Sequence, residues 1–203
     1  MILTYEKGRK DKIHVSIDGE YTMTVDAVYW YSLAIPNKYE IDSEELAELK
    51  SSVNSRRAYN KAIDLISRRE HSRKEIITKL SQRGYGEVAD EVADRLEEKG
   101  YLDDERFANM YAQELKSRRS FGKRRISQEL YMKGIDRDII YDVLENLEES
   151  PQEEIIDILS RKYPHCLEDE KNKARAVNGL IRLGYSSYDI RSAIREYENM
   201  CEE

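Results

Sequence analysis

The sequence predicts a mainly α-helical protein: three tandem three-helix, helix-turn-helix-like repeats of about 50 residues in an elongated, solenoid-like array, preceded by a small antiparallel β-hairpin or meander. The first observation behind this prediction is a leucine that stands four residues before a glycine and recurs every fifty residues, in the pairs Leu80 and Gly84, Leu130 and Gly134, Leu180 and Gly184. A leucine in the last helical turn, followed by a glycine that takes the left-handed conformation, is typical of a glycine-terminated helix.

A second marker recurs in the same order, at the end of a different helix. It is a serine followed by two basic residues, at Ser67, Ser117 and Ser160. The third copy is stretched, because Ser160 lies seven residues further from its leucine than Ser67 and Ser117 lie from theirs, with Pro164-His165-Cys166 at the break. Intact markers around an insertion indicate a longer connector in the third repeat.

The N-terminal residues 2–25 alternate between apolar and polar side chains, which is the pattern of β-strands. Asp18-Gly19 separates two alternating runs, and an Asp-Gly pair of this kind predicts a hairpin. Ile2–Glu6 adds a third candidate strand. The aromatic stretch around Trp30 has two interpretations, a seam that joins the sheet to the helices or an exposed binding patch.

The helix signals divide the chain into four segments. Asp42 and Glu45 form a capping pattern for a short helix that belongs to the N-terminal extension. Ser72 and Glu75 form another inside the first repeat, and Ser150-Pro151 opens the third. The expected boundaries are residues 1–54 for the extension, and 55–101, 102–149 and 150–203 for the three repeats.

Composition excludes several classes of protein. Charged residues make up 37% of the chain and hydrophobic residues 39%, with a net charge of -7, so we do not expect bulk electrostatic binding of nucleic acid. No apolar run is long enough for a membrane span or a signal peptide, which predicts a cytoplasmic protein, and we expect a monomer. The two cysteines are expected to be free thiols. We find no motif for catalysis, a metal or a cofactor, and expect none.

A basic stretch in the second repeat is the strongest candidate for a binding site. It contains Lys116, Arg118, Arg119, Lys123, Arg124 and Arg125, with no acidic residue among them. One interpretation is a solvated loop whose arginines favour the carbonyl end of a helix. The other is a cradle for a phosphate backbone or an acidic protein surface, in which Gly122 lets the ligand approach closely. In the second interpretation the equivalent cations of the other repeats join it, namely Arg68, Arg69, Arg161 and Lys162.

Asp103-Asp104-Glu105 has the composition of a magnesium or acid–base site. The three residues also follow Gly100 at the expected start of a helix, where carboxylates cap free amides and suit the helix dipole. We favour this structural role, and an enzyme centred on Asp103 and Asp104 stays a rival hypothesis. A second rival is a sequence-specific helix-turn-helix DNA-binding protein, which the acid-rich third helices, at residues 87–99 and 137–149, disfavour.

From about Ala58 to the C-terminus the chain resembles the bacterial regulatory RecX family. The most specific match runs from Gly100 to Ala108, with the sequence GYLDDERFA, and continues through Gly122, Ile126, Glu129-Leu130 and Lys133-Gly134-Ile135. The chain departs from the family pattern in the aromatic segment Ala27–Ile35 and in the long connector of the third repeat.

The resemblance implies a non-enzymatic modulator of the RecA recombinase. Such proteins bind in the groove of the RecA filament on single-stranded DNA, across several protomers, and restrain its recombinase, ATPase and coprotease activities in DNA repair and the SOS response. The implied partners are therefore the RecA filament and the single-stranded DNA within it. The family offers no catalytic motif to carry over, so the basic residues above are the candidate binding residues.

Overall fold

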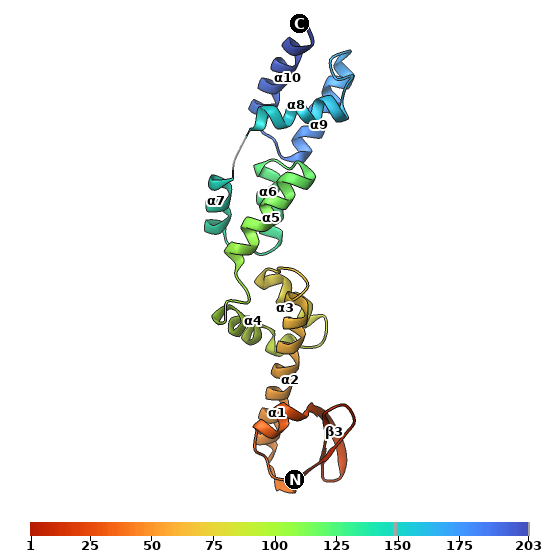
Figure 1. Ribbon diagram of the computed structural model, residues 1–203, viewed down its shortest axis with the longest axis vertical. Coiled ribbons are helices and arrows are strands. Elements are labelled where there is room, and N and C mark those ends of the chain that lie inside the picture. Colours follow the sequence, from red (N-terminus) through yellow and green to blue (C-terminus); the bar gives the residue numbers. More distant parts are fainter. Residues whose placement is uncertain (148–149, 203) are drawn as a thin grey trace. The chain divides into compact units, whose positions relative to one another are not determined.

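The computed structural model describes residues 1–147 and 150–202, apart from the side chain of Glu202. It is mainly helical with a small N-terminal antiparallel sheet, as the sequence predicted (Figure 1). The chain divides into two compact units: Met1–Asp64 with Leu80–Val92, and Leu65–Lys79 with Ala93–Glu203.

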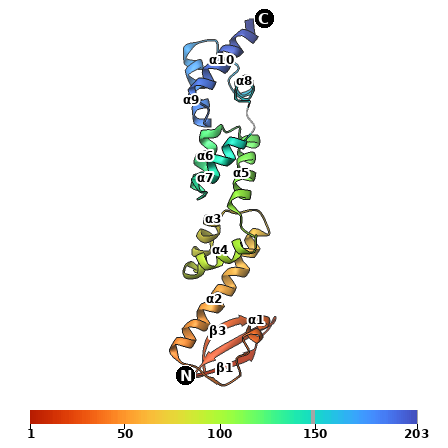
Figure 2. The same cartoon turned by 90° about the vertical axis from the view of Figure 1, so that its left-hand side faces the viewer.

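Four antiparallel strands form the sheet of the first unit, in the order β3-β2-β1-β4 (Figure 2). They are β1 (Ile2–Lys7), β2 (Lys12–Ile17), β3 (Glu20–Asp26) and β4 (Tyr39–Glu40). The predicted hairpin turn is confirmed, because Asp18 and Gly19 both have positive φ, 50° and 84°. Strand β1 is the predicted third strand, whereas the two-residue β4 was not predicted.

The aromatic segment proves to be mostly a seam between sheet and helix. Helix α1 (Ala27–Ser32) begins at Asp26, whose carboxylate accepts hydrogen bonds from the amides of its first turn. Trp30 is 1% exposed and lies in a core with Leu3, Val15 and Val53. The side chains of Val28 and Tyr31 point to solvent.

Helix α2 (Ser43–Ile66) contradicts one expectation. The short helix that was expected to end before residue 55 continues without a break to Ile66. Its start is the predicted capping box, since the Glu45 amide donates to the Asp42 carboxylate at 2.9 Å and the Asp42 amide donates to the Glu45 carboxylate at 3.0 Å. No glycine or proline interrupts the segment, and Val53 and Ala58 continue the buried face across the expected break.

The remaining helices follow the predicted repeats. They are α3 (Arg73–Ser81), the 3₁₀ turn η1 (Gly86–Val88), α4 (Ala89–Glu98), α5 (Asp104–Arg119), α6 (Lys123–Met132), α7 (Arg137–Asn146), α8 (Pro151–Lys162), α9 (Glu170–Leu183) and α10 (Ser187–Glu202). The expected end of the second repeat, at residue 149, lies outside the described residues, and the bounds of the four segments stay a prediction.

The recurring leucine–glycine pair forms the same helix end three times. Gly84, Gly134 and Gly184 all have positive φ, between 83° and 95°. The amide of the residue after each glycine donates to the leucine carbonyl, at 3.1–3.2 Å for Tyr85, Ile135 and Tyr185. A hydrogen bond from an amide to the carbonyl five residues earlier, around a left-handed glycine, is the Schellman motif. The marker found in the sequence therefore ends a helix.

The second unit contains a separate core for each of the last two repeats. Helices α5, α6 and α7 bury Ile126 and Leu130 completely, together with Phe107 and Val143. Helices α8, α9 and α10 bury another set around Leu180. Each of these cores therefore belongs to one repeat.

Candidate binding surface

Within the second unit, consecutive repeats meet through one recurring contact. At the first junction the Ser72 hydroxyl, just before α3, donates to the Lys133 carbonyl at the end of α6, at 2.7 Å. At the second junction the Gly122 amide, just before α6, donates to the Leu183 carbonyl at the end of α9, at 2.8 Å. Each contact joins the start of one repeat's second helix to the glycine-terminated end of the next repeat's second helix. The basic stretch therefore contains a structural junction.

The close approach at Gly122 involves the protein's own backbone. A Cβ atom at Gly122 would lie 2.8 Å from the Gly184 carbonyl, and one at Gly184 would lie 2.4 Å from the Arg125 amide nitrogen. Both distances are too short for a real contact, so the two glycines let α6 and α9 meet. The interpretation of Gly122 as space for a ligand is therefore wrong: Gly184 occupies that space.

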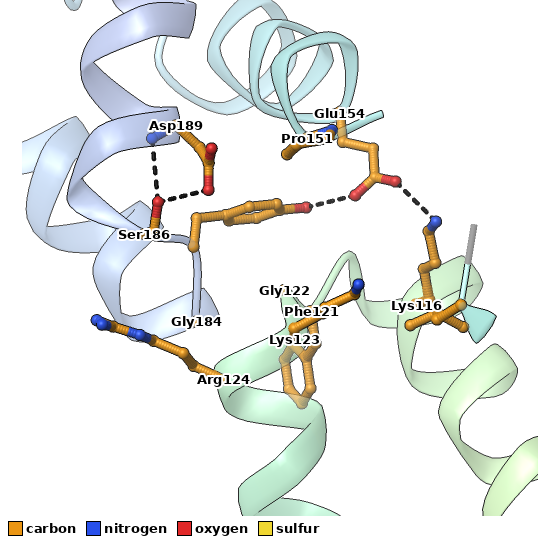
Figure 3. A pocket seen from close by; sticks show the side chains of 12 residues that line it. Lys116, Phe121, Gly122, Lys123, Arg124, Pro151, Glu154, Gly184, Ser186 and Asp189 are labelled. Atoms are coloured by element: carbon orange, nitrogen blue, oxygen red, sulfur yellow. Dashed lines mark hydrogen bonds and ion pairs between the residues drawn. The ribbon is translucent and has the colours of Figure 1, made fainter. Parts of the chain in front are cut away.

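Lys116 takes part in a polar network that spans the second junction (Figure 3). Its ammonium group lies 3.1 Å from the Glu154 carboxylate, which also accepts a hydrogen bond of 3.1 Å from the Tyr185 hydroxyl. Burial, and then the adjacent Glu154 charge, raise the pKa of Tyr185, so this hydroxyl stays a proton donor. With its side chain only 21% exposed, Lys116 is positioned to hold repeats together rather than to contact a partner.

The first junction contains a carboxylate with two cationic partners. Glu75, at the start of α3, lies 3.1 Å from Arg69 and 2.7 Å from Lys133, and its side chain is 14% exposed. Burial alone would raise the pKa of Glu75, but the hydrogen bonds from Arg69 and Lys133 outweigh it and lower the pKa to about 2. Of the predicted capping box only one half forms, in which the Glu75 amide donates to the Ser72 hydroxyl.

Several other candidate cations also have acidic partners. Arg118, whose side chain is 78% exposed, forms an ion pair of 3.2 Å with Glu114 one turn earlier. Arg125 lies 2.7 Å from Glu129, and Arg161 pairs with Asp157. Exposed pairs of this kind contribute little to stability and are screened by salt, so Arg118 and Arg161 remain accessible to a competing anion.

Four candidate cations have no acidic partner among the described residues, namely Arg68, Arg119, Arg124 and Lys162, and all four are exposed. Arg119 lies over the ring of Phe121 at 5.9 Å, and Arg125 lies over the same ring at 5.6 Å. Phe121 thus contacts one guanidinium group from α5 and one from α6. Lys123 and Arg124 line the pocket of Figure 3, beside Gly184 and Ser186.

The acidic cluster has the structural role that we favoured. Asp103 caps α5 by accepting from the Arg106 amide at 2.8 Å. Asp104 accepts from the Arg73 amide at 2.8 Å and so caps α3. Burial raises the pKa of Asp104, and the Arg73 amide opposes this shift. In the part of the chain that the structure describes, no three acidic, histidine or cysteine side chains are grouped so that they could hold a metal ion.

Sequence reasoning missed three contributors to this surface: Phe121, Glu154 and Tyr185. The partners of Glu154 lie 31 residues away at Tyr185 and 38 residues away at Lys116, so no local motif marks this network. The partners of Phe121 are local, Arg119 and Arg125. One signal was available in the repeat spacing. Glu154 stands fifty residues after Asp104, which accepts a hydrogen bond at the start of α3. Tyr185 stands fifty residues after Ile135, which follows the glycine at the end of α6. Repeat register therefore pointed to the second junction.

The fold and this surface define a class of tandem three-helix repeat proteins with an exposed basic surface. Two family models match the chain, the first three-helix domain of RecX at residues 58–96 and the second at residues 103–144. The chain is 30% identical over 183 residues to regulatory protein RecX of Caldanaerobacter subterraneus subsp. tengcongensis, which covers 90% of this chain and 89% of that one. It is 34% identical over 143 residues to the Chlorobium phaeobacteroides protein of the same name, covering 70% of this chain and 93% of that one. The protein belongs to the RecX family of regulatory proteins.

Solved structures agree on the fold. A crystal structure of regulatory protein RecX aligns with a TM-score of 0.73 at 20% identity, covering 96% of this chain and 98% of the other. A crystal structure of RecX from Lactobacillus salivarius aligns with a TM-score of 0.63 at 21% identity, covering 71% and 97%. Among the described residues, no helix combines the length and the apolar character that crossing a membrane would need.

Proposed function

We propose that this protein is a non-enzymatic regulator of the RecA recombinase, which acts as a monomer in the groove of the RecA filament on single-stranded DNA. There it would restrain filament growth, strand exchange, ATP hydrolysis and coprotease activity during DNA repair and the SOS response. Membership of a family of regulatory proteins supports a regulatory role. A protein that acts on such filaments works in the cytoplasm, beside the chromosome.

The observation that carries the proposal is the exposed positive surface between α5 and α6. Arg118, Arg119 and Arg124 are exposed there, on a chain with a net charge of -7. Arg161 and Lys162 at the end of α8, and Arg68 and Arg69 after α2, supply cations at the same repeat position. Tandem repeats with equivalent cations suit a partner that is itself repeated, since each additional contact gains from effective concentration.

Lys116 and Arg125 contribute less directly in this proposal. Both are tied to the second junction, Lys116 through Glu154 and Arg125 through its backbone contact with Gly184. Their expected role is to position the exposed arginines. Lys123, which lines the adjacent pocket, stays among the proposed binding residues.

A sequence-specific DNA-binding protein is the alternative function. It would place a third helix in the major groove, as helix-turn-helix proteins do. Helix α4 carries Asp90, Glu91 and Asp94, and α7 carries Asp138 and Asp142, all exposed. These carboxylates would lie near phosphates, which disfavours the alternative.

The proposal is tested by titrating the protein into ATP-bound RecA filaments on single-stranded DNA, and separately onto bare strands, at two salt concentrations. We expect tight filament binding with loss of ATPase activity, and weak, salt-sensitive binding to bare DNA. Equal binding to both, or tighter binding to one duplex sequence, would favour the alternative.

A charge-reversal variant then tests the surface itself. Arg118→Glu with Arg124→Glu should weaken filament inhibition on the order of tenfold, because both side chains are exposed and repulsion replaces attraction. The control is Arg191→Glu with Arg195→Glu, which changes the net charge equally on exposed positions of α10. Equal effects of the two double variants would show that only net charge matters, and unchanged inhibition by the first would eliminate the surface.

A further inference from the structure

The second repeat has an apolar hollow between α6 and α7, and its lining includes the core residue Ile140. The hollow has a volume of about 510 Å³ and is lined by Ser127, Gln128, Tyr131, Arg137, Ile140, Tyr141 and Leu144. Tyr131 is 60% exposed and Tyr141 is 65% exposed. Two large, solvent-exposed aromatic side chains beside apolar residues are typical of a surface that contacts a partner.

The fold does not require these tyrosines. The residues fifty positions from Tyr131 are Ser81 and Ile181, and the residue fifty positions after Tyr141 is Arg191. The neighbouring repeats therefore form the same helices without an aromatic pair. The core of the second repeat is complete without it as well, because it consists of other side chains such as Ile126 and Leu130. Something other than folding accounts for the exposed aromatic surface.

Charge indicates what fits the hollow. Arg137 is the one charged residue among those that line it, and this guanidinium group has no hydrogen-bond or ion-pair partner among the described residues. On the flank of α7 next to the hollow, Asp138, Asp142 and Glu145 are exposed. Three carboxylates repel a phosphate chain, so bases stacking on the tyrosines are disfavoured. An apolar segment with an acidic residue at the Arg137 end and basic residues toward the α7 flank is complementary.

We propose that the hollow between α6 and α7 binds an amphipathic helix of a filament protomer, whose apolar face packs on Tyr131 and Tyr141 and whose carboxylate pairs with Arg137. This inference rests on the proposed function. It assigns the hollow of the second repeat to protein binding and the basic surface of the same repeat to anion binding. Two adjacent helices form the groove into which the apolar face of a third helix packs. Tyrosine and arginine are also the residue types that dominate binding free energy at protein interfaces.

The first test uses a double variant that carries both Tyr131→Ser and Tyr141→Gln. The single variant Tyr188→Gln is its control. Tyr188 is 72% exposed on α10 and lies outside the hollow, so it controls for the loss of a surface tyrosine. The double variant should bind RecA filaments on the order of tenfold or more weakly, with an unchanged melting temperature and unchanged binding to bare single-stranded DNA. The control should bind both like the wild type.

The second test identifies what touches the hollow. A photoreactive phenylalanine replaces Tyr131, and the full-length protein is irradiated on purified RecA filaments that carry labelled single-stranded DNA. Crosslinking to the RecA chain supports the inference, and crosslinking to the DNA overturns it.

The outcomes separate this inference from the proposal on which it rests. Unchanged filament binding by the double variant, or a parallel loss of bare-DNA binding, overturns the tyrosine surface while the regulator proposal stands. If the wild-type protein itself does not bind RecA filaments, the proposed function fails, and the inference fails with it.

Discussion

Glu75 should contribute to stability only while it is ionised, and Glu75→Gln isolates that contribution. The carboxylate joins Arg69, in its own repeat, to Lys133 at the end of α6. These partners lower the pKa of Glu75 from its ordinary value of 4.5 to about 2. A lowered pKa in the folded state means stability that is present above pH 4.5 and lost as the pH falls toward 2.

The magnitude follows from the two pKa values. Their difference corresponds to about 3.4 kcal/mol at neutral pH, about 1.4 kcal/mol at pH 3 and about 0.4 kcal/mol at pH 2. These are upper values, because Arg69 is half-exposed and solvent screens its charge. We therefore expect Glu75→Gln to reduce the free energy of unfolding by about 2 kcal/mol at pH 7 and by less than half of that at pH 3.

The assay is urea unfolding followed by the helical circular dichroism signal, for wild type and variant at both pH values. Glu114→Gln serves as the control, because Glu114 is 53% exposed and pairs only with exposed Arg118 among the described residues. Its expected cost is below about 0.5 kcal/mol. A difference for Glu75→Gln that is equally small at pH 7, or that stays constant down to pH 3, would refute the reasoning.

Two further predictions concern backbone geometry. Gly184→Ala should destabilise the protein by about 3 kcal/mol or more, since its φ is 95° and the new Cβ would lie 2.4 Å from the Arg125 amide nitrogen. Gly84→Ala is the control, because Gly84 has φ 83° but no neighbour within 4 Å, and it should cost only about 1–2 kcal/mol in the same urea assay. Equal losses of stability for the two variants would argue against a close backbone contact at Gly184. Ser120→Gly should raise the free energy of unfolding by about 1 kcal/mol, because Ser120 ends α5 with φ 54°, and a lower melting temperature would contradict this.

Local signals in the sequence predicted the parts of the fold that local geometry determines. A leucine four residues before a glycine is sufficient for the helix end, and Asp18-Gly19 is sufficient for the hairpin turn. The expected break near residue 55 failed because serines and an asparagine weaken a helix only slightly when one face stays buried. Tertiary packing outweighs propensity there.

The candidate site was predicted less completely, because its geometry depends on partners far apart in the chain. The basic residues were found by composition, yet nothing local shows that Lys116 meets Glu154 or that Gly122 meets Gly184. The exposure of Tyr131 and Tyr141 was equally inaccessible, since an apolar side chain at helical spacing is more often part of a core. Only the packed structure separates the two cases.

The two junctions share one geometry and differ in chemistry, and this difference has a consequence for regulation. The first relies partly on the charges of Glu75 and Lys133, whereas the second relies on a backbone contact between glycines and on the network around Glu154. Salt should therefore weaken the ion pairs of both junctions, whereas acid should weaken the Glu75 ion pairs of the first junction only as the pH falls toward 2. If consecutive repeats meet successive protomers, their spacing sets the effective concentration of each new contact. Loosening the first junction would then reduce affinity for the filament while each single contact keeps its strength.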